Sequence, residues 1–153
     1  MVAKQHFSLM RDQSEFKTGE PAPDIKAAQE AIFQANHIVL IYPLWLGTMP
    51  AVLKGFFEQV LRPDFSFDYL PSGQTRPRLK GRSCRIVITM GMPALVYRWF
   101  FGAHSLKSLE RNILKFVGFG PIRESLFGMV DAASSEKRTH WIAQMRALGR
   151  KAS

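Results

Sequence analysis

The sequence contains a single cysteine, Cys84, and no hydrophobic run that approaches the length of a membrane span. One cysteine excludes an intramolecular disulfide and is typical of a reducing compartment. A transmembrane helix needs about 20 consecutive apolar residues, which no segment supplies. Residues 1–10 include Lys4 and His6 and lack the apolar core of a secretory signal. We therefore expect a cytoplasmic protein without membrane insertion.

Acidic residues are absent between Asp68 and Glu110, in a chain whose formal net charge is +9. The basic residues of this stretch are Arg76, Arg78, Lys80, Arg82, Arg85, Arg98 and Lys107. A solvated basic surface, an anionic small molecule such as a nucleotide phosphate, and an acidic protein partner all fit this charge. No zinc-finger spacing and no RNA-binding aromatic signature accompanies it, so we do not expect nucleic-acid binding.

The residue patterns of hydrolases and metalloenzymes are also lacking. The four histidines, His6, His37, His104 and His140, are far apart in the sequence. None belongs to a Ser-His-Asp arrangement or a metal-ligand cluster, and no paired carboxylates follow a predicted strand. The chemistry that remains is that of a bound cofactor, for which the protein supplies shape and electrostatics.

Strand and helix patterns alternate along the chain. Helical spacing of apolar residues predicts helices at residues 24–36, 51–61, 105–117 and from residue 134 onward. Short apolar runs without polar alternation predict buried strands at residues 38–42, 85–90 and 123–130. Residues 1–23, 62–82 and 91–103 read as irregular. The alternation predicts one α/β domain, residues 24–153, with a parallel sheet, preceded by an irregular lead-in, residues 1–23.

Ligands of such sheets bind outside the carboxyl ends of the strands, so the loops found there are the candidate site. The first strand runs into a stiff apolar loop, residues 43–50, which contains two prolines and one glycine. The second runs into Thr89, Met90, Gly91 and Met92. Packing on the chain's own domain and a platform for a flat aromatic ligand are both open interpretations of the first loop.

Residues 42–58, with the sequence YPLWLGTMPAVLKGFFE, carry a resemblance to a known family. The segment resembles the central motif of the flavodoxin-like NAD(P)H:quinone oxidoreductases. That family includes the ancillary flavoproteins of bacterial potassium-efflux systems and the modulators of drug activity. The similarity continues through residues 64–67, 79–82, 89–91 and 118–119 and covers residues 24–150.

The resemblance implies a flavodoxin-like three-layer sandwich around a five-stranded parallel sheet. It also implies a flavin, FAD or FMN, with NAD(P)H as co-substrate. The implied reaction is two-electron hydride transfer from NAD(P)H through the flavin to a quinone-like acceptor. The implied assembly is a homodimer with its sites at the interface.

Carried over residue by residue, the resemblance assigns three groups. The flavin contacts would be Pro43, Leu44, Trp45, Leu46, Thr89, Met90, Gly91 and Met92. Tyr97 and His104 would be the catalytic pair that stabilises charge on the reduced flavin, although a helix-start residue is the alternative for His104. Phe67 and Tyr69 would wall the substrate pocket, in one subunit or its partner, with simple packing as the alternative.

The chain departs from the family at its beginning. Only 23 residues precede the first predicted helix, and none reads as a strand followed by a small-residue loop. We therefore expect an N-terminally truncated fold that lacks the first strand–helix unit and its phosphate-binding loop. Residues 38–42 would then form an open edge, covered by residues 2–9 or by a second subunit.

Three interpretations of the function follow. The first, which we favour, is a flavin-dependent NAD(P)H:quinone oxidoreductase. The second is a cofactor-free or weakly flavin-binding relative that acts as a regulatory or binding module, for example on a potassium-efflux transporter. The third is a fragment of a longer protein.

Overall fold

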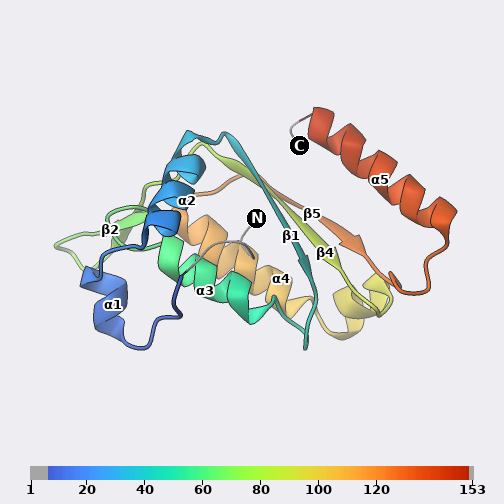
Figure 1. Cartoon of the computed structure of the whole chain (residues 1–153), viewed down its shortest axis with the longest axis horizontal. Helices are drawn as coiled ribbons and strands as arrows, with labels where there is room; N and C mark the ends of the chain where they lie inside the picture. The colour runs from blue at the N-terminus through green and yellow to red at the C-terminus, as the bar shows by residue number, and fades with distance from the viewer. Residues whose placement is uncertain (1–6, 152–153) are drawn as a thin grey trace.

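The structure, a computed structural model, describes residues 7–151. Its centre is a parallel sheet with the strand order β1-β4-β5. The strands are β1 (His37–Pro43), β4 (Ser83–Thr89) and β5 (Ile122–Phe127), and their carboxyl ends meet at one edge (Figure 1). All three predicted strands are thus confirmed in kind and order, and β5 ends three residues earlier than expected, ahead of Met129, whose φ of 57° is outside the strand region.

One face of the sheet carries the main core. Leu40 and Tyr42 of β1 point to the same side as Ile86 and Ile88 of β4. This face is covered by α2 (Pro23–Gln34), α3 (Ala51–Val60) and α4 (His104–Ser108), which continues into the π-helix η3 (Leu109–Lys115). Among residues 7–151, one helix lies on the opposite face, α5 (Ser135–Arg150). Within residues 7–151, no helix combines the length and apolar character that crossing a membrane requires.

The five-stranded sheet implied by the resemblance is not observed among the described residues, where the parallel sheet has three strands. A separate antiparallel pair, β2 (Phe67–Tyr69) and β3 (Thr75–Pro77), lies in the predicted irregular stretch 62–82. The π-helix η2 (Val96–Phe100) lies in the other, residues 91–103. Short elements of three to five residues leave too few periodic positions for a sequence pattern to register.

The lead-in also differs from the prediction, because it contains the short helix α1 (Gln13–Thr18). The Asp12 side chain caps this helix by accepting hydrogen bonds from the backbone N–H groups of Ser14 and Glu15, at 2.7 and 3.1 Å. A hydrogen bond from the Ser14 hydroxyl, together with these two backbone hydrogen bonds, holds the pKa of the Asp12 carboxyl below its ordinary value. A six-residue helix with no buried residue has no apolar stripe, so its cap was the available sequence signal.

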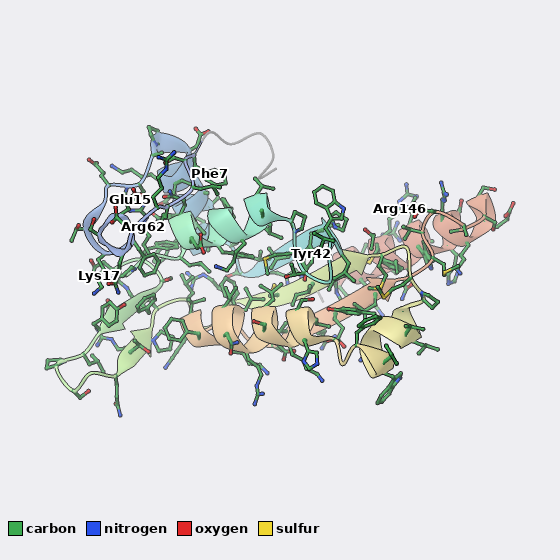
Figure 2. The ribbon with its side chains drawn as sticks, turned by 90° about the horizontal axis from the view of Figure 1, so that it is seen from below. Phe7, Glu15, Lys17, Tyr42, Arg62 and Arg146 are labelled. Atoms are coloured by element: carbon green, nitrogen blue, oxygen red, sulfur yellow. The ribbon has the colours of Figure 1, made fainter. Side chains whose placement is uncertain are left out.

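The lead-in packs against α3 rather than against β1 (Figure 2). The Phe7 ring lies 6.1 Å from the Phe56 ring, and the Gln59 side chain donates to the Ser8 carbonyl at 2.7 Å. The buried Arg62 guanidinium donates to the Glu15 carbonyl at 2.9 Å. The prediction that residues 2–9 cover β1 is therefore wrong for residues 7–9, and residues 2–6 lie outside the described residues.

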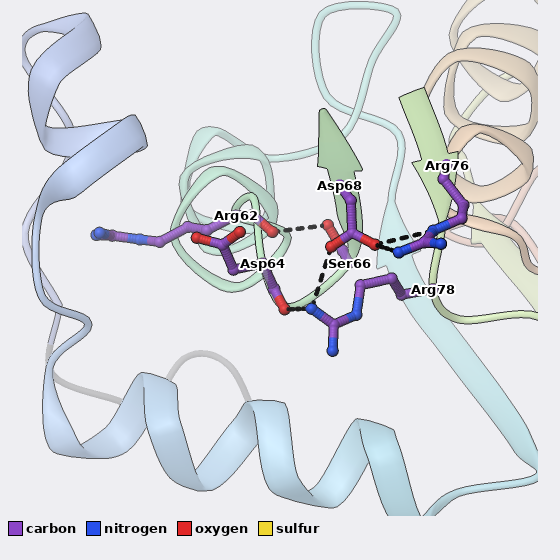
Figure 3. A network of polar contacts seen from close by, with 6 residues as sticks. All are labelled: Arg62, Asp64, Ser66, Asp68, Arg76 and Arg78. Atoms are coloured by element: carbon purple, nitrogen blue, oxygen red, sulfur yellow. Dashed lines mark hydrogen bonds and ion pairs between the residues drawn. The ribbon is translucent and has the colours of Figure 1, made fainter. Parts of the chain in front are cut away.

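Most of the basic stretch is engaged within the fold. Arg76 and Arg78 both pair with Asp68 across the β2–β3 hairpin, with N–O distances of 2.7 and 3.2 Å (Figure 3). The hydrogen bond from Arg76 lowers the pKa of the Asp68 carboxyl. Arg82 donates to the Phe33 carbonyl at 2.6 Å, and Arg85 is buried. Arg98 pairs with Glu124 at 2.8 Å. Five of the seven basic residues of this stretch therefore contact other groups of the described chain or are buried.

Candidate functional site

Three loops meet at the carboxyl edge of the sheet. The backbone N–H of Leu44, after β1, donates to the Thr89 carbonyl at 2.8 Å. After β4, the Met90 N–H donates to the Phe127 carbonyl at 2.9 Å, and the Met92 carbonyl accepts from the Met129 N–H at 3.1 Å. Segments more than 35 residues apart in the sequence are thus joined side by side, as the parallel topology predicted.

The loop after β1 projects a tight turn. Trp45 and Thr48 exchange two backbone hydrogen bonds of 2.9 Å, and the residues between them, Leu46 and Gly47, have positive φ angles of 47° and 78°. Two central residues with positive φ define a type I′ turn, in which glycine relieves the strain at its own position. The turn leaves Leu46 fully exposed and Trp45 61% exposed, and Pro50 then precedes α3 as its N-cap residue.

A pocket of about 500 Å³ lies between this turn and α4. Its lining includes the Trp45 indole, the Leu46 side chain, the hydroxyl-bearing Thr48, Ser105 and Ser108, and Lys54. A flat apolar surface next to several hydrogen-bonding groups is typical of sites for planar ligands with polar edges. Lys54 also forms an ion pair with Glu58, one helical turn further along α3.

Helix N-termini add positive potential at this edge. Because strands and helices alternate, α3, α4 and α5 all begin where the strands end. The first N–H groups of a helix lack intrahelical partners and carry a partial positive charge, so the edge favours oxygen-rich or anionic groups. Ala51, at the start of α3, is part of the pocket lining.

Two of the eight predicted flavin contacts, Trp45 and Leu46, line this pocket. Thr89 instead lines a groove on the α5 side of the sheet. Gly91 is exposed in the second loop, where a Cβ atom would lie 3.3 Å from an Asp131 carboxylate oxygen. Met90 is buried.

The remaining members of that set are Pro43, Leu44 and Met92. Pro43 is exposed at the end of β1, while Leu44 and Met92 are partly buried against the core. The structure therefore gathers all eight residues at one edge of the sheet and distributes them over its two faces and the core. Their role as flavin contacts stays a prediction.

The sequence reasoning missed the polar part of the pocket: Thr48, Lys54, Ser105 and Ser108. Ser105 and Ser108 are three residues apart at the start of a predicted helix, so their spacing places them on one helix face. That signal was available in the sequence. The sequence does not indicate that α4 begins beside the Trp45 turn, so the two sides of the pocket could not be brought together from it.

Tyr97 and His104 have different surroundings. Tyr97 is buried, and its hydroxyl hydrogen-bonds the Ser105 hydroxyl at 2.7 Å and accepts from the Leu106 N–H at 3.1 Å. His104 is exposed and follows Ala103, whose φ is 48°. Among residues 7–151, no hydrogen bond links the Tyr97 hydroxyl to the His104 ring. The catalytic role of this pair stays a prediction.

The Tyr42 hydroxyl lies in the core behind the first loop. The side chain is 3% exposed, and its hydroxyl has no hydrogen-bond partner within the described chain. Burial, and then the neighbouring Tyr97, raise the pKa of this phenol well above its ordinary value, so it is neutral at any physiological pH.

Phe67 and Tyr69 lie at the other end of the molecule. Both belong to β2, on the side away from the carboxyl edge (Figure 1). Phe67 is buried and stacks edge to face with Tyr69 and Phe116, at centroid distances of 5.3 and 4.9 Å. Within one chain, these two aromatics do not reach the pocket at Trp45.

The fold and this carboxyl-edge site define a flavodoxin-like protein. The family described as "Flavodoxin-like fold" matches residues 2–148. Because the match covers nearly the whole chain, this protein belongs to that family.

Two curated relatives are each 30% identical to the chain over 116 residues. One is an uncharacterized NAD(P)H oxidoreductase of Haemophilus influenzae, matched over 75% of this chain and 57% of its own length. The other is NAD(P)H dehydrogenase [quinone] 1 of Rattus norvegicus, matched over 72% of this chain and 42% of its own length. The chain thus spans about half the length of these relatives.

Solved structures confirm the fold. The NAD(P)H:quinone oxidoreductase of Methanothermobacter marburgensis aligns with a TM-score of 0.77 and 23% identity, over 96% of this chain and 77% of the other. An FMN-dependent NADH-azoreductase of Bacillus anthracis, in complex with FMN, aligns with a TM-score of 0.71 and 16% identity, over 99% and 79%. At these identities the likeness concerns the fold alone.

Proposed function

We propose that this chain binds a flavin at the carboxyl edge of its sheet and takes part in NAD(P)H:quinone oxidoreduction. The observation that carries the proposal is the pocket between the Trp45 turn and α4. It lies where ligands of doubly wound sheets bind. The names of the Haemophilus and rat relatives support the reaction class, and the FMN in the Bacillus azoreductase supports a flavin on this fold.

The residues of the pocket fit the ring of a flavin. The Trp45 indole offers a flat surface, and the hydroxyls of Thr48, Ser105 and Ser108 can bond the polar edge of a planar heterocycle. A pocket of about 500 Å³ lies within the usual range for small-molecule sites. When bound, a flavin supplies the capacity to accept a hydride from NAD(P)H and pass it on. The chain's own residues bind the ring, orient it and exclude water from one side.

Anchoring of the flavin phosphate is the weaker part of the fit. Among residues 7–151, the pocket lining includes Ala51, the first residue of α3, and Ser105, in the first turn of the five-residue helix α4, and neither helix has a side-chain cap. Lys54 adds one cation, which Glu58 partly neutralises. We therefore expect flavin to bind this chain weakly, with a dissociation constant in the micromolar range or above.

The test is an absorption spectrum of the purified protein after incubation with FMN or FAD and desalting, followed by fluorescence titration with each flavin. Trp45→Ala should weaken flavin binding about tenfold, because it removes the flat apolar wall. Phe33→Ala, an exposed aromatic on α2 far from the pocket, is the matched control. If neither flavin binds the wild-type chain in titration, the proposal is wrong for this chain.

Turnover is measured separately, as NADH or NADPH oxidation with 1,4-benzoquinone by the flavin-loaded protein. Flavin binding without turnover would identify the chain as a flavin-binding module and exclude the oxidoreductase function. The assay also decides between NADH and NADPH as the hydride donor.

Assembly bears on the substrate pocket. Phe67 and Tyr69 lie away from the carboxyl edge of their own chain, so a role for them at the quinone requires the homodimer that the resemblance implies. Light scattering during size-exclusion chromatography measures that state. A monomer that turns over quinone would remove these two residues from the substrate site.

A further inference from the structure

The second face of the parallel sheet is only partly covered. Side chains of β1 alternate between the two faces, and those on the side of α5 are exposed: Val39 is 47% and Ile41 is 69% exposed. Their parallel neighbours on β4 include Val87, and Phe127 of β5 continues the same apolar surface. Parallel sheets are normally covered by helices on both faces, so this exposure calls for an explanation.

The helix α5 does not close this face. Its apolar stripe, Trp141, Ile142 and Met145, is directed toward the sheet, yet none of its residues is buried. The main contact is between the rings of Trp141 and Phe127, 5.1 Å apart, and Ile142 is 54% exposed. A groove of about 690 Å³ remains between α5 and the strands. Figure 1 shows α5 beyond β5, away from the helices of the other face.

The charges at this groove have one sign. Its charged lining residues are Arg138 and Arg146, and no acidic side chain among the described residues lines it. Arg138 donates to the Val130 carbonyl at 3.2 Å, which fixes its position at the rim. Arg146, labelled in Figure 2, has no ion-pair partner within residues 7–151. An occupant with carboxylates beside its apolar surface would complement both arginines.

We propose that this groove binds an amphipathic helix of a partner polypeptide, with apolar side chains against Ile41, Val87 and Ile142 and carboxylates facing Arg138 and Arg146. A helix is the occupant that covers the face of a parallel sheet, because it satisfies its own backbone while burying one apolar stripe. The groove runs beside α5, whose 16 residues span ~24 Å. That length takes four to five turns of a docking helix, roughly what a stable helix–groove interface uses.

A second copy of this chain fits the groove less well. The amphipathic helix α5 of a second copy carries one acidic residue, Glu136, against four basic ones, Lys137, Arg138, Arg146 and Arg150, so it would bring mainly cations to a cationic rim. The formal charge of +9 adds to that repulsion. The complementary occupant is therefore acidic and comes from elsewhere. The proposal does not depend on flavin binding, which concerns the pocket on the other side of the edge.

The probe is a fluorescein-labelled synthetic peptide of about 18 residues, ~27 Å as a helix, with leucine on one face and glutamate on the other. Its control has lysine at every glutamate position. Fluorescence anisotropy with the full chain should show saturable micromolar binding of the glutamate peptide and far weaker binding of the lysine peptide.

Two variants with matched controls localise the binding. Arg146→Glu should weaken the glutamate peptide about tenfold and strengthen the lysine peptide, whereas Arg111→Glu, on the exposed side of η3, should change neither by more than about twofold. Ile142→Ser should weaken binding, and Val52→Ser, an equally accessible apolar residue on α3, should not.

Equal effects of the two arginine reversals would overturn the proposal, because they indicate attraction to the overall charge alone. Equal binding of the glutamate and lysine peptides would do the same. Light scattering provides the remaining outcome. A concentration-dependent dimer that Ile142→Ser dissociates would identify a second copy as the occupant and exclude the acidic helix.

Discussion

Replacement of Tyr42 by phenylalanine should stabilise the protein. The Tyr42 ring is buried beside the core of β1 and β4, and its hydroxyl has no partner within residues 7–151. An unmade hydrogen bond at a buried polar group costs about 1–3 kcal/mol, while the ring itself fills the same space without the oxygen. We expect Tyr42→Phe to raise the free energy of unfolding by about 1 kcal/mol, with an increase of ~3 °C in the midpoint temperature.

Tyr97 provides the matched control for this experiment. Its hydroxyl is equally buried but hydrogen-bonds Ser105 and the Leu106 N–H. Tyr97→Phe should therefore lower the free energy of unfolding by about 1–2 kcal/mol. Urea denaturation at pH 7 measures both variants, with equal slopes confirming a two-state comparison. A Tyr42→Phe variant that is less stable than wild type would refute the reasoning, because it means that the hydroxyl has a partner in solution.

Three further predictions concern other parts of the fold. Burial raises the pKa of the Cys84 thiol to about 12, so the folded state keeps a proton that the unfolded state loses above about pH 9. The stability of wild type relative to Cys84→Ala should then be constant below that pH and fall by about 1.4 kcal/mol per unit above it; a flat difference in urea titrations up to pH 10 contradicts the shift. Gly128→Ala places its Cβ 2.4 Å from the Ala94 nitrogen, and should cost about 2 kcal/mol in thermal unfolding, a neutral result meaning that the loops can separate. Arg62→Met removes the hydrogen bond to the Glu15 carbonyl and should lower the free energy of unfolding by about 2 kcal/mol. Amide hydrogen exchange should accelerate more in α1 than in β4. Equal acceleration in both would show that the lead-in does not open as a separate unit.

The parallel sheet could be predicted from the sequence because its signal is strong and local. The runs at Ile38 and Ile86 are apolar without alternation, which indicates strands buried on both faces, and helical periodicity separates them. For β4 that inference holds, since Val87 and Ile88 are both buried on opposite faces. For β1 it holds on one face only, because Ile41 is 69% exposed. An apolar run indicates that its residues favour burial, but it does not indicate whether another element of the fold covers them.

The site could be placed from the sequence, but its pocket could not be assembled. The rule that ligands bind at carboxyl ends put Trp45 and Gly91 at one edge, where the structure also has them. The pocket's hydroxyl side depends on how the residues after β4 return to the sheet. That path is set by the π-helix η2 and by the positive φ at Ala103, features without a periodic signature. The eight residues predicted as flavin contacts from the motif therefore lie on both faces of the sheet at this edge.

The two binding surfaces proposed for this chain differ in how completely helices cover the sheet face on which each lies. The pocket at Trp45 lies on the face that α2, α3 and α4 cover, between the Trp45 turn and α4, and its lining suits a planar ligand. The groove at Ile142 lies on the face where, among residues 7–151, α5 is the one helix present, held by the ring contact between Trp141 and Phe127 and by the hydrogen bond from Arg138 to the Val130 carbonyl. Because none of the α5 residues is buried, its position should respond to whatever fills the groove. Phe127 lines that groove, and its carbonyl accepts from the Met90 N–H at the carboxyl edge. Peptide binding at the groove should therefore alter the flavin affinity of the pocket, and by linkage flavin should alter peptide affinity by the same factor. Titrating FMN with and without saturating glutamate peptide measures that factor, and a value of one would mean that the two faces act independently.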